Sequence, residues 1–138
     1  MKAPPLLQIP AERPALPDPE RVSALLRDFA QPLLHIDPSG PADMETIRTA
    51  LGLAMICWNL PVYEAIGSPL FERGMRTLDK ISAQVPAPVA ACLSRLLVER
   101  KTTFATLPFL ATVEVSGDQV KHATIAAEAR WPRSEPPA

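Results

Sequence analysis

The sequence predicts a predominantly helical α+β fold, in which a four-helix bundle is followed by a C-terminal β-hairpin. Three observations support this class. Apolar residues recur at three- and four-residue steps through most of the chain. After Pro108 the period changes to two, which is typical of strands. Of the 138 residues, 47% are hydrophobic and 21% are charged, so the chain can bury a core without disulfides or metals.

Prolines mark the ends of the expected domain. Six of the 17 prolines fall within residues 1–19, a density that excludes a helix there. We therefore expect an extended arm or tail over 1–18, one globular domain over 19–130 and a disordered tail over 131–138. The first residues lack the apolar run that a secretory signal needs, and we expect a cytoplasmic protein.

The first helix is expected over 19–34. Asp18 precedes it as an N-cap, and Pro19 suits its first turn. Pro32 should kink this helix or end it at Gln31, because proline lacks the amide donor that continues a helix.

The second helix, over 41–60, is the expected core helix. Residues 50–58 are apolar on all sides, which predicts that other elements surround them. This stretch is shorter than the roughly 20 residues needed to span a bilayer. Gly52 within it predicts a close crossing by another helix, and Pro61 should end or kink the helix.

Two further helices should follow. Ser68 is a candidate N-cap for a helix that runs to about Gln84, with a Glu72–Arg76 pair on its outer face. The fourth helix begins at the turn 85–88 and frays through 100–103. Its basic cluster, Arg95, Arg100 and Lys101, is expected to be a solvated helix end that complements the helix dipole.

The alternating pattern over 109–115 predicts a strand, and a returning strand over 120–129 completes a hairpin at about 108–129. The alanines of 126–129 are also compatible with a helix. A two-residue turn would place Glu114 opposite Lys121, whereas a three-residue loop would place Val113 opposite Ala123 and keep one apolar face. We expect the second, because burying a face outweighs one exposed ion pair.

Composition and motifs exclude several classes of function. A net charge of −1 gives no drive toward nucleic acid or an anionic membrane, and we expect neither as a partner. Cys57 and Cys92 are isolated, no CxxC or HExxH is present, and we assign no metal site. Neither a GxSxG elbow nor a glycine-rich phosphate loop occurs. We assign no catalytic residue and no cofactor.

The sequence therefore favours a bacterial-type accessory or regulatory protein that acts by binding another protein or a second copy of itself. A lone hairpin is marginal in water, so it should either lie across the helices or pair with a second chain as a homodimer. The alternative is a small ligand-binding domain or a hydrolase-like enzyme. Its pocket would lie at the break made by Pro61, with Asn59, Tyr63, Glu64 and His35 as binding residues.

Overall fold

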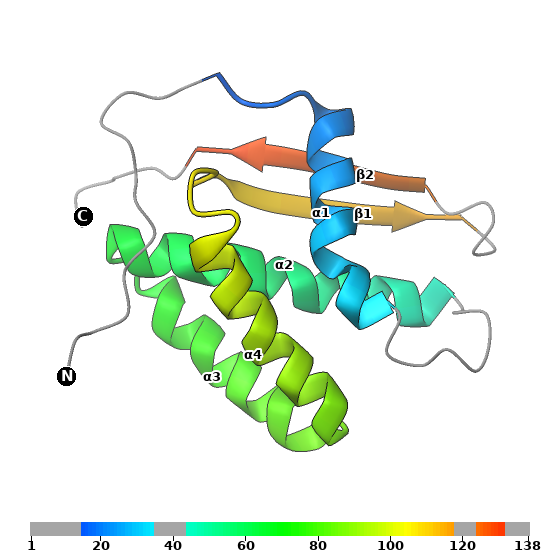
Figure 1. The fold of residues 1–138 in the computed structure, drawn as a ribbon, viewed down its shortest axis with the longest axis vertical. Coiled ribbons are helices and arrows are strands. Elements are labelled where there is room, and N and C mark those ends of the chain that lie inside the picture. Colours follow the sequence, from blue (N-terminus) through cyan, green and yellow to red (C-terminus); the bar gives the residue numbers. More distant parts are fainter. Residues whose placement is uncertain (1–14, 35–43, 118–123, 132–138) are drawn as a thin grey trace.

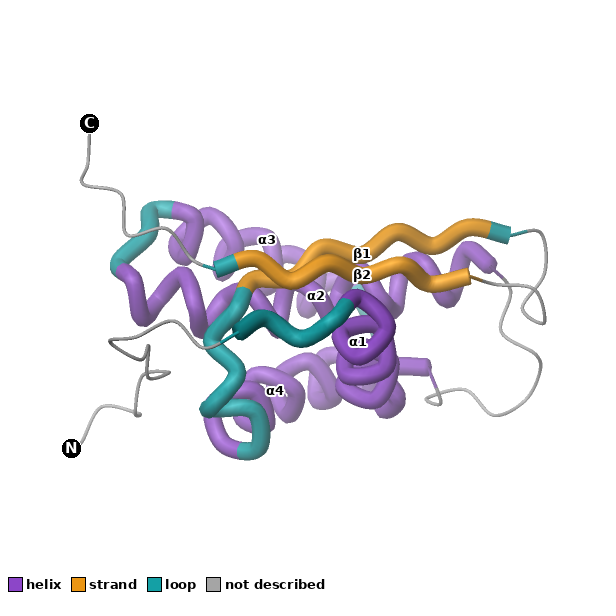
Figure 2. Tube along the Cα trace, turned by 90° about the horizontal axis from the view of Figure 1, so that it is seen from above, coloured by secondary structure: helices purple, strands orange, loops and turns teal. Residues whose placement is uncertain are grey.

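The computed structural model describes residues 15–34, 44–117 and 124–131. Its element order is α1 (Pro19–Leu34), α2 (Met44–Ile66), α3 (Leu70–Gln84), α4 (Ala87–Thr102), β1 (Leu110–Ser116) and β2 (Thr124–Arg130). The two strands form an antiparallel hairpin. α1 lies across one face of this hairpin, α2 runs beside β1, and α3 and α4 pack on the opposite side of α2 (Figures 1 and 2). The predicted class, mostly helical with a C-terminal hairpin, is confirmed.

α1 begins as its sequence predicts. The backbone N–H of Arg21 donates to Oδ1 of Asp18 over 2.8 Å, so Asp18 caps the helix. The helix does not stop at Gln31 but continues through Pro32 to Leu34. A proline in the last turn removes only one donor, and Leu33 beyond it is buried in the core.

α2 is continuous through Pro61, so the expected end of the helix at this proline is wrong. It ends instead at Gly67, whose φ of 69° is the left-handed conformation that favours glycine. The N–H of Ser68 donates to the carbonyl of Tyr63 over 2.9 Å and the N–H of Gly67 to that of Glu64 over 3.2 Å. These two bonds form a Schellman motif, which turns the chain sharply into α3.

The apolar stretch of α2 is buried on one side. Leu51, Ala54 and Trp58 are buried, whereas Leu53 and Ile56 are half-buried, so the expected burial on all sides holds only in part. By length and composition alone, Ile47–Ile66 could also cross a membrane, and half of that window lies inside the structure. The core helix of a globular domain meets the same criterion.

The close approach between α2 and α3 occurs at Gly74 and not at Gly52. A Cβ atom at Gly74 would collide with the side chain of Leu60, whereas one at Gly52 would meet no atom within 4 Å. The prediction of a close crossing at Gly52 is therefore wrong. The absence of a side chain at Gly74 is what lets α3 pack tightly on α2.

The hairpin differs in register from the expected one. Val113 pairs with Ala127 rather than with the expected Ala123. Glu114 lies opposite Ala126, so the alternative register with Glu114 opposite Lys121 is not formed either. In the described part of the hairpin the last paired residues before the turn are Ser116 and Thr124. The shift of four residues is even, so the predicted apolar face is retained. Residues 126–129 belong to the strand and not to a helix.

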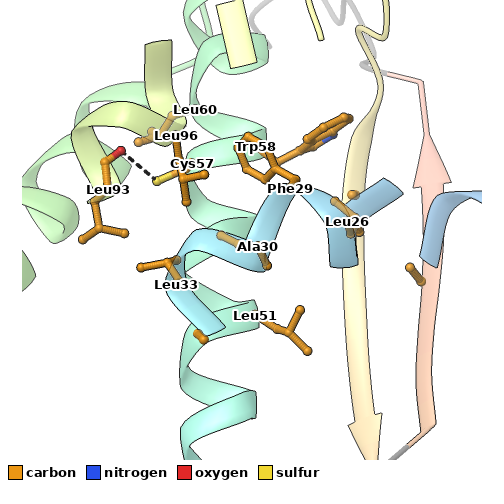
Figure 3. Packing of buried hydrophobic residues seen from close by; sticks show 14 of the residues in the cluster. Leu26, Phe29, Ala30, Leu33, Leu51, Cys57, Trp58, Leu60, Leu93 and Leu96 are labelled. Atoms are coloured by element: carbon orange, nitrogen blue, oxygen red, sulfur yellow. Dashed lines mark hydrogen bonds between the residues drawn. The ribbon is translucent and has the colours of Figure 1, made fainter. Parts of the chain in front are cut away.

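The core is centred on Trp58. Its ring lies 5.2 Å from that of Phe29 on α1, 5.4 Å from Phe104 after α4 and 5.4 Å from Phe109 before β1, measured between centroids. Figure 3 shows Phe29 and Trp58 together, with Cys57 turned toward α4. One residue of α2 therefore contacts α1 and both ends of the segment that joins α4 to β1.

Candidate functional site

The side chain of Asn59 occupies the outer edge of β1. Its Nδ2 donates to the carbonyl of Ala111 over 3.0 Å, and the N–H of Ala111 donates to its Oδ1 over 2.8 Å. The carboxamide thus pairs with β1 as the backbone of a neighbouring strand would. Further along the same edge, Nε of Arg48 donates to the carbonyl of Val115 over 3.4 Å. Both polar ends of Asn59 are therefore engaged within the fold.

The opposite edge of the hairpin also meets a helix. The N–H of Ala127 in β2 donates to Oγ of Ser23 on α1 over 3.1 Å. Side chains of α2 and α1 thus bond to the outward-facing backbone of β1 and β2, a common way in which proteins protect sheet edges. The hairpin lies across the helices, which is one of the two arrangements expected from its sequence.

Arg100 is buried, and its expected place at a solvated helix end is wrong. Its side chain is 0% exposed, and its guanidinium carbon lies 3.7 Å from the centroid of the Trp58 ring. Nε donates to the carbonyl of Trp58 over 2.8 Å, Nη1 to that of Phe104 over 2.6 Å and Nη2 to that of Leu107 over 2.6 Å. A longer bond of 3.4 Å joins Nη2 to the carbonyl of Phe109.

Backbone carbonyls, rather than a carboxylate, hold this cation. Among the described residues no acidic side chain pairs with Arg100. Burial lowers the pKa of Arg100 to about 9, because desolvation disfavours the charged form. The side chain remains a cation at neutral pH. It joins α4 to the segment between α4 and β1 and to the turn of α2 that precedes Pro61.

The corner between α2 and α3 forms a pocket of about 360 Å³. The Schellman turn at Gly67 folds α3 back along α2, and Ser68 caps α3 by accepting the N–H of Leu70 over 3.2 Å. The pocket lies on this corner and combines aromatic, hydroxyl and acidic side chains. Its lining residues are Tyr63, Glu64, Gly67, Ser68, Pro69, Phe71 and Glu72.

One ion pair is formed by a residue that lines this pocket. Nζ of Lys101 lies 3.0 Å from Oε1 of Glu64, and both side chains are mostly buried. That oxygen accepts no hydrogen bond within the described part of the chain, so the nearby ammonium is what balances its charge. Glu72 does not form the expected ion pair with Arg76. It lines the pocket instead.

The structure brings together two of the four residues predicted as binding residues. Tyr63 and Glu64 line the pocket, whereas Asn59 is engaged with β1 and is not among the lining residues. His35 lies outside the described residues. Sequence reasoning missed Ser68, Phe71 and Glu72 as pocket residues, although their position directly after Gly67 was a signal that the sequence offered.

Both thiols are buried. Cys57 is 0% exposed, and burial, with a smaller contribution from the charge of Cys92, raises its pKa to about 12. Its Sγ faces the carbonyl of Leu93 at 3.7 Å. Burial also raises the pKa of Cys92. Neither thiol has the character of a nucleophile at neutral pH. In the described ranges no group of three potential metal ligands occurs.

Comparison with models of known protein families, with curated proteins and with solved structures gives no match to this chain. Function must therefore be inferred from the chemistry of its own surfaces, and the fold alone does not supply it.

Proposed function

We propose that this protein is a non-catalytic accessory or regulatory protein that acts through protein–protein interaction. The observation that carries the proposal is the corner between α2 and α3. There, a pocket lies beside Leu70, a large apolar side chain that is 44% exposed. A pocket beside an exposed apolar side chain offers a partner both a cavity to fill and an apolar surface to bury.

The buried side chains support a non-catalytic role for this protein. Three groups outside the pocket that could carry reactions or bind ligands hold the fold together instead: Asn59 on β1, Arg100 on four carbonyls, and the thiol of Cys57 in the apolar core. Free buried thiols also fit the cytoplasmic location that we propose.

The partner is another protein or a second copy of this chain. The hairpin edges are a weaker candidate surface than the sequence suggested, because Asn59 and Ser23 already bond to their outward-facing groups. A homodimer would then form through the corner between α2 and α3. Light scattering during gel filtration, over a wide range of protein concentration, tests this case.

The main test compares two substitutions of exposed apolar residues. Leu70→Asp places a charge at the corner, whereas Val98→Asp places one on α4, where Val98 is 62% exposed. We expect Leu70→Asp to abolish dimerisation or the recovery of a cross-linked partner, and Val98→Asp to preserve it. A protein that stays monomeric and yields no partner, or a partner lost equally in both variants, would contradict the proposal.

The pocket itself favours a second candidate, a small-ligand-binding or hydrolase-like domain. Its volume of about 360 Å³ is within the range of known ligand sites. Because Leu70 does not line the pocket, a small ligand should bind equally well to the Leu70→Asp variant. A partner protein should not bind to the Leu70→Asp variant, and this difference separates the two candidate functions.

A further inference from the structure

We propose that the pocket between α2 and α3 receives a cationic side chain, arginine or lysine, from the partner protein. The proposal rests on the proposed function and specifies what the partner presents. Two features of the pocket carry it: the aromatic side chains of Tyr63 and Phe71, and the unequal balance of charge among the groups around them.

The aromatic side chains favour a cation over a neutral group. The face of an aromatic ring attracts an ammonium or guanidinium, and the attraction grows as water is excluded. Tyr63 and Phe71 are both half-buried, and Phe71 also packs against the core, which fixes one wall of the pocket. This protein already contains such a contact, because the guanidinium of Arg100 lies on the ring of Trp58.

The charges leave one negative group without a partner. Lys101 neutralises Glu64 through their 3.0 Å contact. Glu72 forms no ion pair within the described residues, although Arg76 lies one turn further along α3. Two carboxylates and one ammonium give the site a net charge of −1, so a single added cation would balance it. An anionic ligand would meet the opposite sign of charge.

The Glu64–Lys101 pair also shows that a carboxylate lining the pocket accommodates a cationic nitrogen. Lys101 approaches Glu64 from α4, whereas the residues that line the pocket belong to α2, the turn and α3. A side chain from a partner that seats its apolar surface on Leu70 would reach the same carboxylates from solvent. The exposed leucine and the pocket would then bind one continuous segment.

The test uses the single tyrosine of the chain as the reporter. Fluorotyrosine incorporated at Tyr63 gives one ¹⁹F signal, which is followed during titration with N-acetyl-arginine amide. N-acetyl-citrulline amide, which has nearly the same shape and no charge, is the control. N-acetyl-lysine amide decides between the two cationic side chains. We expect a saturable shift with a cationic probe and none with citrulline.

Substitutions locate the binding. Glu72→Gln should weaken binding of the cationic probe about two- to fivefold, the loss expected for one exposed ion pair. Glu114→Gln, an exposed glutamate on the outer face of the hairpin, should leave it unchanged. Equal shifts with citrulline, or an unchanged affinity in Glu72→Gln, would overturn the proposal.

The two proposals can fail separately. If Leu70→Asp abolishes partner binding while no cationic probe shifts the Tyr63 signal, the corner is an interface but does not bind a cation. If the cationic probe binds and Leu70→Asp has no effect on any partner, the pocket is a small-ligand site and the proposed function is wrong.

Discussion

Replacing Arg100 with methionine should destabilise the protein by about 3–5 kcal/mol, because several buried carbonyls lose their donor and each unsatisfied group costs about 1–3 kcal/mol before the core relaxes. The substitution keeps an unbranched side chain of similar length and removes every donor. Three of the four carbonyls lie within 2.8 Å of the guanidinium, and each bond to a charged group contributes about 1.5–3 kcal/mol. The contact with the Trp58 ring adds roughly 2 kcal/mol when desolvated.

Two effects reduce this gross loss. Methionine fills much of the vacated volume, and the variant no longer keeps a cation in the core, a desolvation cost of several kcal/mol. The net value is therefore well below the summed contributions, but it stays large because the carbonyls of Trp58, Phe104 and Leu107 remain buried without donors.

Urea denaturation followed by tryptophan fluorescence and circular dichroism measures the change. Arg95→Met, at an exposed position on the same helix, is the matched control and should lie within about 0.5 kcal/mol of the parent. Amide hydrogen exchange should also accelerate in β1 before it does so in α3. If the unfolding free energies of Arg100→Met and Arg95→Met agree within about 1 kcal/mol, the carbonyl contacts do not stabilise the fold as described.

Three further predictions follow from contacts elsewhere. Asn59→Asp should lower the free energy of unfolding, measured with heat or urea, by about 2 kcal/mol, because a carboxylate cannot donate to the Ala111 carbonyl. An unchanged free energy of unfolding would show that the contact with the edge of β1 is dispensable. Gly74→Ala should lower the free energy of unfolding by about 1–3 kcal/mol, because the added Cβ meets Leu60. Gly52→Ala, where a Cβ meets no atom, should raise the free energy of unfolding by up to about 1 kcal/mol. Equal effects of the two substitutions in urea unfolding would contradict the close approach at Gly74. The pKa of Cys57 is about 12 in the folded chain against 9.0 for an ordinary thiol, so between these pH values only the unfolded chain loses the proton. Stability should therefore fall as pH rises above about 9, by up to about 1.4 kcal/mol per pH unit, and Cys57→Ala should remove that part of the slope.

Local signals in the sequence predicted the elements well. Asp18 and Pro19 mark the start of α1 because capping depends only on the adjacent backbone. The apolar face of the hairpin was also predictable, since parity along a strand fixes which side chains share a face. The register was not, because it depends on the length of the connection, and the turn-forming Ser116 and Gly117 fit several lengths.

The misplacement of Arg100 has a clear cause, which is that one of its acceptors is distant in sequence. The carbonyl of Trp58, which accepts from Nε of Arg100, lies 42 residues before it. Nothing near Arg100 in the sequence announces that acceptor. The spacing of Leu93, Leu96 and Arg100 does place the arginine on the apolar face of α4, a signal that outweighs the usual solvation of basic residues at a helix end.

The interior contacts and the surface pocket are linked through consecutive residues of α4. Arg100 points into the core and binds the carbonyls around Trp58, whereas Lys101 reaches the pocket and neutralises Glu64. The position of the last turn of α4 therefore sets both the docking of the hairpin and the charge balance of the pocket. Loss of the Arg100 contacts frees this turn, and with it the ammonium that compensates one of the two carboxylates. A binding site at the corner between α2 and α3 is in this way sensitive to the packing of a hairpin that does not line it.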